Sequence, residues 1–327
     1  MDHWQRIEAA IAGHATDRIP VALWRHFPVD DQDPGKLAAH TLAWQRAWDF
    51  DLVKFMPSGT YGIEDWGAKT AFEGAGNGAR VVTQVGLRAP DDWRRLPALD
   101  VRKGVYGAQN QALAAVAGEL KGSAPILQTV FSPLTTARKL AGEATLQHLR
   151  QHPDALEAGL KTITEVTIAF GEAALKAGAH GFFFATQLAT IDVLSPTEYE
   201  RFGKRWDIEF FNAFKGRTRV DMLHLHGLNP MFDELAGYPV GLVNWHDRLT
   251  APTLKAAAGR FPGALVGGVE ELGLLVKGSE AEVRAQARDA IAQTGGRRLL
   301  LGPGCVAGIA APEQNIRAVI EEARKNP

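Results

Sequence analysis

Residues 219–227, with the sequence RVDMLHLHG, form a short apolar run that ends in two histidines. In an extended chain, side chains two positions apart point the same way, so a strand here places His224 and His226 on one face. Two adjacent imidazoles can bind a metal ion, but each can equally form a hydrogen bond with a neighbouring backbone group. The rest of the chain has to separate these two interpretations.

Apolar runs of similar length recur along the chain, and a helix-like segment or an insertion follows each of them. Besides the histidine run, the predicted strands are residues 18–27, 51–57, 125–132, 181–186, 240–247, 264–270 and 298–305. Short apolar strands that alternate with helices are typical of parallel strands buried on both faces. Eight such units predict one α/β domain over residues 1–327, a (β/α)8 TIM barrel.

A doubly wound parallel sheet is the alternative arrangement of these units. Its nucleotide-binding versions carry a Gly-x-Gly-x-x-Gly or Walker A sequence, and neither follows the first predicted strand. Residues 58–100 are rich in glycine and irregular, so we interpret them as an insertion after strand two. This insertion is expected to cover the mouth of the barrel or to form a subunit contact, as in a homodimer.

The composition argues against several classes of function. With 36 basic and 37 acidic residues, the chain has no excess of positive charge for binding nucleic acid or an anionic membrane surface. No apolar run has the length of a signal peptide or a membrane span. The single cysteine, Cys305, cannot form an internal disulfide, which fits a reducing compartment. We therefore expect a cytoplasmic protein.

In a (β/α)8 barrel the carboxyl ends of all strands meet at one mouth, where active sites lie. His224, His226 and Cys305 fall at such ends and offer two imidazoles and a thiolate. This donor set suits Zn2+, accommodates other divalent metals, and leaves one tetrahedral position open. His246 or Glu270 could fill that position or support a ligand from behind.

Other polar residues at the predicted strand ends complete the candidate site. Arg25 could bind a substrate carboxylate or phosphate, although an arginine at a rim is as often part of a structural ion pair. His246 and Glu270 are candidates for an acid or a base. Gln187 and the backbone at Gly304 are candidates for binding a cofactor. The remaining polar residues at these ends are His26, Lys54, Gln128, Thr186, Asp247 and Glu271.

Several motifs resemble those of the uroporphyrinogen decarboxylase superfamily, which includes the haem-pathway decarboxylase and zinc-dependent methyltransferases that demethylate a corrinoid protein. The motifs are RIPV at 18–21 followed by Arg25, GAHG at 178–181, LSP at 194–196, LHLHG at 223–227, GGV at 267–269, Gly304-Cys305, and PEQNIRA at 312–318. The resemblance runs nearly end to end and implies a (β/α)8 barrel, in agreement with the pattern of strands and helices.

The predicted mouth resembles the methyltransferase branch more than the decarboxylases. The decarboxylases carry an arginine-rich stretch of which this chain keeps only Arg25, so few cationic contacts are expected for a propionate-rich tetrapyrrole. The methyltransferases carry a His-x-Cys motif and a second cysteine after the last strand. His224 and Cys305 match these residues, whereas His226 replaces the first cysteine. The resemblance implies Zn2+ at these three residues and a corrinoid (cobalamin) as the methyl carrier.

The predicted function is therefore methyl transfer between a corrinoid, which a partner protein could carry, and a thiol or related small-molecule acceptor. Three alternatives stay open. The first is metal-free decarboxylation of a tetrapyrrole, and the second is zinc-dependent hydrolysis or demethylation of a small substrate with Glu270 or Asp247 as the base. The third is a catalytically silent barrel that only binds a ligand or a corrinoid partner.

Overall fold

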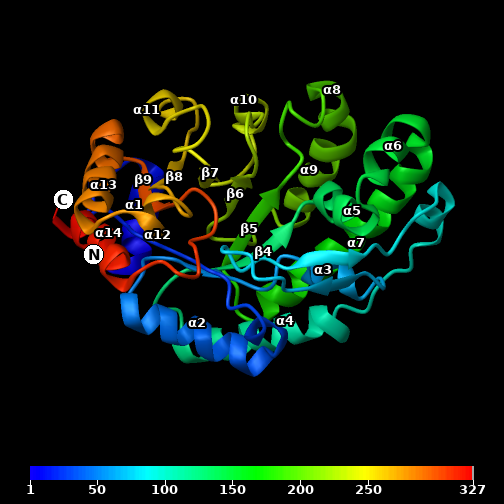
Figure 1. The fold of residues 1–327 in the computed structure, drawn as a ribbon, viewed down its shortest axis with the longest axis horizontal. Coiled ribbons are helices and arrows are strands. Elements are labelled where there is room, and N and C mark those ends of the chain that lie inside the picture. Colours follow the sequence, from blue (N-terminus) through cyan, green and yellow to red (C-terminus); the bar gives the residue numbers. More distant parts are fainter. Residues whose placement is uncertain (326–327) are drawn as a thin grey trace.

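A curved sheet of seven parallel strands, surrounded by helices, forms the centre of the computed structural model, which describes residues 1–325 (Figure 1). Every neighbouring pair in this sheet is parallel, so the carboxyl ends of the strands lie at one edge. The strands follow each other in the order β1 (Val53–Phe55), β4 (Ile126–Phe131), β5 (Gly181–Thr186), β6 (Met222–Leu225), β7 (Leu242–Trp245), β8 (Ala264–Val269) and β9 (Leu299–Pro303).

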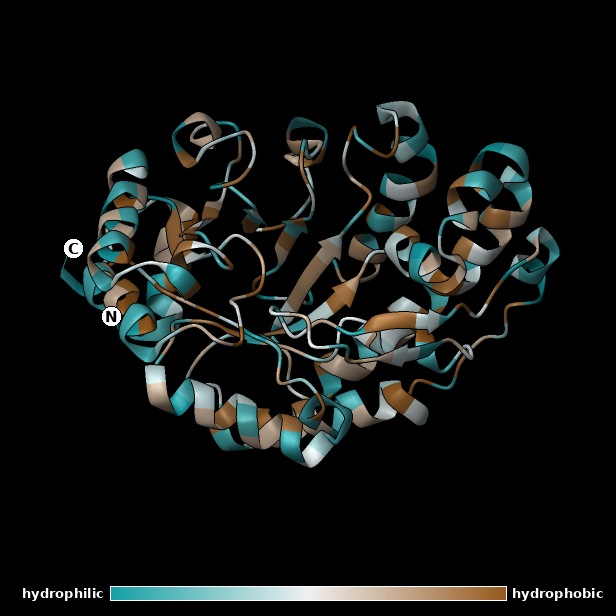
Figure 2. Cartoon of the chain, viewed as in Figure 1, coloured by the Kyte–Doolittle hydropathy of each residue, from teal (hydrophilic) through white to brown (hydrophobic). Residues whose placement is uncertain are grey.

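Helices surround the sheet, whose strands consist mostly of hydrophobic residues, whereas the helices combine hydrophilic and hydrophobic residues (Figure 2). The longer helices are α1 (His3–Ala12), α2 (Pro34–Trp48), α4 (Gly104–Leu120), α5 (Pro133–Ala141), α6 (Ala144–Gln151), α7 (Pro153–Lys176), α9 (Arg205–Ala213), α13 (Glu280–Thr294) and α14 (Glu313–Lys325). Shorter turns are α3 (Tyr61–Glu64), α8 (Pro196–Tyr199), α10 (Phe232–Leu235), α11 (Leu254–Ala257), α12 (Leu274–Lys277), η1 (Asp30–Gln32), η2 (Pro90–Arg95) and η3 (Glu200–Lys204). Among the described residues no helix has the length and apolarity needed to span a membrane.

The first predicted strand differs from the prediction, because residues 18–27 form only one isolated parallel bridge, between Val21 and Leu301. Leu301 donates its N–H to the Pro20 carbonyl, and Ala22 donates to the Leu301 carbonyl. On the other side, the Asp51 N–H donates to the Val21 carbonyl. Pro20 has no N–H to extend the ladder. This segment therefore lies between β9 and the chain that leads into β1, but the sheet contains seven strands rather than eight.

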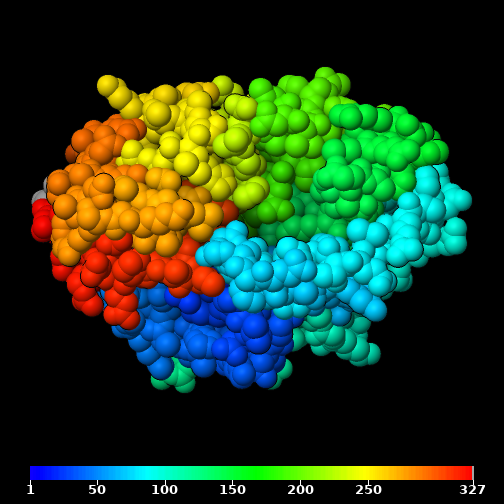
Figure 3. All heavy atoms as spheres, viewed as in Figure 1, coloured from blue at the N-terminus to red at the C-terminus, as the bar shows by residue number. Residues whose placement is uncertain are grey.

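The glycine-rich region 58–100 contains α3, η2 and an antiparallel pair, β2 (Lys69–Ala71) and β3 (Val81–Gln84). In the space-filling view, cyan residues of this region lie across the front, between the orange and green parts of the chain (Figure 3). Part of the region, including Gly59, Asn77 and Arg80, lines the cavity described below.

Asp51 connects α1 to the start of the sheet through a buried network of charges. Its fully buried carboxylate accepts hydrogen bonds from Arg6 at 2.5 Å, from Arg18 at 2.6 Å and from the Val21 N–H at 2.8 Å. His3 adds a contact of 2.9 Å between its Nδ1 and the same carboxylate. Burial opposes ionisation of Asp51, but these partners outweigh it and hold the pKa of Asp51 below its usual range.

Replacing Asp51 by Asn should lower the free energy of unfolding by about 3–5 kcal/mol, because two arginines would then lie near a neutral amide. Denaturation in urea at neutral pH measures this loss. Because the pKa of Asp51 is lower in the folded state, its contribution is present above pH about 4 and is lost as the pH falls further. The difference between the two proteins should therefore shrink in acid.

Asp49→Asn is the matched control, because Asp49 also contacts His3 but its side chain is 66 % exposed. Its effect on unfolding should stay below about 1 kcal/mol. Equal losses in both variants would contradict a special role for the buried carboxylate.

Candidate metal centre

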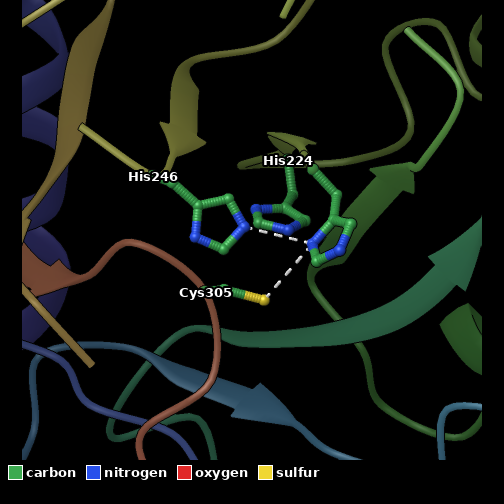
Figure 4. A group of neighbouring side chains, drawn as sticks. His224, His246 and Cys305 are labelled. Carbon is green, nitrogen blue, oxygen red and sulfur yellow. Dashed lines mark hydrogen bonds between the residues drawn. The ribbon is translucent and has the colours of Figure 1, made fainter. Parts of the chain in front are cut away.

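Three histidines and the only cysteine meet at the carboxyl ends of three strands. His224 lies within β6 and His226 directly after it, His246 follows β7, and Cys305 follows β9. One nitrogen of each imidazole and the Cys305 Sγ all lie within 4.8 Å of one another (Figure 4). His226 Nδ1 is 3.2 Å from His246 Nε2 and 3.7 Å from the sulfur. These four residues are called the His/Cys cluster below.

Asn244 on β7 fixes the orientation of His224. Its amide nitrogen donates to the carbonyls of Val266 and Pro303, each at 2.9 Å, so its oxygen must point the other way. That oxygen is 2.6 Å from His224 Nδ1, which therefore carries the proton and donates it. In the neutral form of His224, Nε2 then carries the lone pair that a metal ligand requires.

Glu271 orients His246 in a similar way. Its Oε1 lies 2.7 Å from His246 Nδ1, which leaves His246 Nε2 facing the cluster. The second oxygen of this buried carboxylate has no hydrogen-bond partner in the part of the chain that the structure describes. Gly304 permits the arrangement, because a Cβ there would lie 2.9 Å from Glu271 Oε2 and 3.0 Å from His246 Cα.

The thiol of Cys305 is strongly polarised by its neighbours. Burial opposes its ionisation, but the charge of His224 and hydrogen bonds from the three imidazoles outweigh this and hold the pKa of Cys305 well below its usual range. Burial likewise lowers the pKa of His246, yet its contacts with Cys305 and Glu271 dominate and raise that pKa to about 10. The cluster thus favours a thiolate at neutral pH.

These donors fit a zinc ion. A thiolate and imidazole nitrogens are the ligands that Zn2+ prefers, and four donors match its tetrahedral coordination. The hydrogen bonds of His224 to Asn244 and of His246 to Glu271 are the supporting contacts that metal-binding histidines generally have. Of the two residues that the sequence offers for the fourth position, His246 and Glu270, the structure places His246 beside the three proposed ligands.

A cavity of about 320 Å3 opens in front of the cluster, and His224, His226 and Cys305 form part of its wall. Trp24, Phe131 and Phe183 make much of the wall apolar. The other lining residues are His26, Lys54, Met56, Pro57, Gly59, Thr60, Asn77, Ala79, Arg80, Val82, Thr129, Lys139, Ala185, Gln187 and Val306. His246 does not line the cavity, so it reaches the cluster from another side.

Some of the other predicted site residues lie beside the cluster or its cavity, and others lie elsewhere. Gln187 lines the cavity, and Gly304 packs against His246 and Glu271. Arg25 instead binds the carbonyls of His26 and Ile309 and packs on aromatic rings outside this cavity. Glu270 lies outside the cavity lining. Its backbone N–H donates to the side-chain oxygen of Gln286.

The expectation of few cationic contacts is wrong, because Lys54, Arg80 and Lys139 all line the cavity. Lys54 lies on β1 and falls among the predicted strand ends, but Lys139 lies on α5 and Arg80 on the 58–100 region. No sequence motif indicated that Asn244 supports one of the proposed ligands. A rule that selects polar residues at strand ends cannot find residues on helices or in the inserted region.

Fold and site together define an α/β-barrel-like protein with a candidate metal centre at the carboxyl ends of its strands. The family model for uroporphyrinogen decarboxylase (URO-D) matches residues 2–326, and the chain therefore belongs to the uroporphyrinogen decarboxylase family. Among solved structures, a methyltransferase from Methanosarcina mazei has a TM-score of 0.87 and 22 % identity over 99 % of both chains. A B12-independent methionine synthase from Shewanella sp. has a TM-score of 0.59 and 13 % identity over 96 % of both chains.

Two curated relatives are named methylcobamide:CoM methyltransferase MtaA, both from Methanosarcina barkeri, one of them from strain Fusaro. They are 25 % identical to this chain over 213 and 233 residues. The matches cover 64 % and 70 % of this chain, and 61 % and 66 % of the relatives' own lengths. Because the two solved structures are only 22 % and 13 % identical in sequence to this chain, their similarity to it shows the fold alone.

In chelator-treated protein, the thiolate of Cys305 should persist well below the pH at which an ordinary thiol ionises, about 8.5. Its ultraviolet absorbance, measured against Cys305→Ser during an acid titration, reports this. Glu271→Gln should move the transition to higher pH, because it removes the carboxylate that favours protonated His246. A thiolate band that develops only near the ordinary thiol pKa would contradict the electrostatic account of the cluster.

Proposed function

We propose that this chain is a zinc-dependent methyltransferase that moves a methyl group between a corrinoid, carried by a partner protein, and a small thiol. The observation that carries the proposal is the His/Cys cluster, of which the polarised thiol, His224 and His226 form part of the wall of a cavity at the carboxyl ends of the strands. The family and the two MtaA relatives support it, since these relatives are named for methyl transfer from a cobamide to CoM.

His224, His226 and Cys305 would hold the zinc ion, and His246 would complete the site while no acceptor thiol is bound. When bound, zinc lowers the pKa of a coordinated thiol and so supplies a thiolate nucleophile at neutral pH. The remaining contributions come from the chain itself. Asn244 and Glu271 keep the imidazoles in the tautomer and rotation that point a nitrogen into the cluster.

The cavity wall prepares the space in which the acceptor meets the methyl group. Trp24, Phe131 and Phe183 replace water beside the cluster, and a thiolate that has lost its hydration shell is a stronger nucleophile. Phe183 also stacks on His224, with ring centroids 5.2 Å apart and planes 27° apart, which restricts rotation of that imidazole. These contacts orient and desolvate the acceptor while leaving the mouth as the entry for a protein-borne group.

The cavity gives less support to the alternatives. Activation of water would need a base, but among the described residues no Asp or Glu lines the cavity, and the side chain of Asp247 accepts the Gly268 N–H instead. A volume of about 320 Å3 lies at the lower end of the roughly 300–1,000 Å3 typical of ligand sites, which is small for enclosing a tetrapyrrole, whereas a protein-borne corrinoid would present only its methyl group at the mouth.

Purified protein supplied with zinc should bind about one zinc ion per chain, whereas His224→Ala, His246→Ala and Cys305→Ser should retain much less, because each removes one ligand of a four-ligand site. Elemental analysis measures the metal. His14→Ala is the control, since His14 is exposed and far along the chain from the cluster. Asn244→Ala keeps all four ligands and should weaken zinc binding about 10–100-fold.

The zinc-loaded protein should then demethylate methylcobalamin in the presence of a thiol, which the change in the cobalamin spectrum follows. Cys305→Ser should abolish this activity, and His14→Ala should keep it. Wild-type protein that folds normally and binds no zinc would overturn the proposal. So would zinc-loaded protein that transfers no methyl group to any thiol offered, whether from methylcobalamin or from methylated corrinoid proteins.

A further inference from the structure

The β2–β3 hairpin (residues 69–84) forms part of the wall of the cavity in front of the His/Cys cluster. The hairpin residues in this wall are Asn77, Ala79, Arg80 and Val82. The region that contains the hairpin lies across the front of the molecule in the space-filling view (Figure 3). The cavity is therefore enclosed on this side only while the hairpin stays in place.

Few contacts hold the hairpin on the rest of the protein. Gly78 is the only buried residue between positions 69 and 84. Within residues 1–325, two hydrogen bonds join the hairpin to other segments. Thr70 Oγ1 donates to the Glu64 carboxylate at 2.9 Å, and the Ile309 N–H donates to the Gly76 carbonyl at 2.9 Å. A segment that buries so little surface separates from the protein at a lower cost in free energy than a core strand does.

The hairpin is held together by contacts of its own. β2 and β3 form an antiparallel ladder, and the Arg80 guanidinium donates to Thr70 Oγ1 at 3.0 Å and to the Thr70 carbonyl at 2.9 Å. At the tip, the Gly78 N–H donates to the Ala75 carbonyl at 2.8 Å and closes a turn. These bonds survive if the hairpin leaves the cavity wall, so it can move as one unit.

The tip of the hairpin meets the rest of the protein at one tight contact. Gly78 has a φ of +79°, and a Cβ there would lie 2.7 Å from His26 Cβ and 3.1 Å from Ile309 Cγ2. Only glycine, which lacks a Cβ and tolerates positive φ, lets the tip approach this closely. His26 is itself buried and belongs to the cavity wall. The contact at Gly78 therefore closes the hairpin directly onto the cavity.

We propose that the β2–β3 hairpin is a flap over the cavity and that Gly78 is the contact that holds it closed. Its ends are at Gly67, which is exposed with a φ of +86°, and at Gly86, whose N–H donates to the Leu140 carbonyl at 2.8 Å. Opening breaks the hydrogen bond from Ile309 and gives a ligand a path to the His/Cys cluster. Closure excludes water from the cluster. Such a flap controls access for any ligand, so it does not depend on the function proposed above.

Alkylation of Cys305 measures access to the cavity, because Cys305 is the only thiol of the chain and lies in the cavity wall. The full chain, freed of metal by a chelator, is treated in parallel with iodoacetamide, which is small and neutral, and with the larger, neutral N-phenylmaleimide. Mass spectrometry follows both reactions, and Cys305→Ser corrects for reaction at other groups. Both reagents require the thiolate, so the ratio of their rate constants, relative to that for N-acetylcysteine, reports access rather than the pKa of the thiol.

The wild type should disfavour the larger reagent by about tenfold or more relative to N-acetylcysteine, because the flap is mostly closed. Gly78→Ala should remove most of this discrimination, since the added Cβ keeps the tip away from His26. Gly74→Ala is the matched control. Gly74 has a similar φ of +83°, but a Cβ there has no atom within 4 Å, so alanine adds comparable backbone strain without the contact. Equal ratios in the three proteins, or no discrimination in the wild type, overturn the flap.

Ile309→Ala gives a second way to loosen the tip and decides the question if Gly78→Ala does not fold. It removes the Cγ2 atom beside Gly78 without adding strain, and it should also lower the discrimination between the two reagents. Ile191→Ala is its control, because Ile191 is 61 % exposed and lies outside both the hairpin and the cavity lining. The same discrimination in Ile309→Ala as in Ile191→Ala would count against the flap.

Amide hydrogen exchange supplies an independent measurement of opening. The Ile309 N–H loses its acceptor, the Gly76 carbonyl, when the flap opens, whereas the Ala307 N–H keeps its bond of 3.0 Å to the Trp24 carbonyl. Gly78→Ala should therefore accelerate exchange at Ile309 and leave exchange at Ala307 unchanged, and Gly74→Ala should change neither. Exchange at Ile309 that is as slow in folded Gly78→Ala as in the wild type would show that the tip does not lift, and would overturn the proposal.

Discussion

One buried side-chain amide, that of Asn244, joins four neighbouring strands at the candidate site. From β7 it donates to carbonyls at Val266 on β8 and Pro303 on β9, and it accepts from His224 on β6. A side chain with no exposed surface and these three partners cannot rotate without losing hydrogen bonds that water is not there to replace. The relative positions of His224, His246 and Cys305 therefore depend on the strand register, rather than on flexible loops.

The same register explains which parts of the site the sequence predicts. His224 and His226 are two positions apart at a strand end, so the period of two places both toward the mouth, and Cys305 follows the last strand closely enough to join them. The period of two no longer predicts side-chain direction beyond the end of a strand. β8 ends at Val269, and the chain then turns, so that Glu271 rather than Glu270 reaches His246.

The fold itself is predicted well from its alternating apolar and amphipathic segments, with one instructive difference. Residues 18–27 have the composition of a strand, yet Pro20 lacks an N–H and the segment keeps only one bridge. Its position depends instead on Asp51, a charged residue that binds Arg18 and the Val21 N–H. Apolar patterns cannot reveal such a contact, because it joins polar groups that are 30 or more positions apart.

Charge balance connects the cluster to the cavity in front of it. The resemblance to methyltransferases with two cysteines implies two thiolates, whereas this chain supplies one thiolate and three imidazoles. A less anionic donor set leaves more positive charge on a bound metal, which lowers the pKa of an incoming thiol further but also makes its thiolate less nucleophilic. Lys54 and Lys139 add positive potential to the same space.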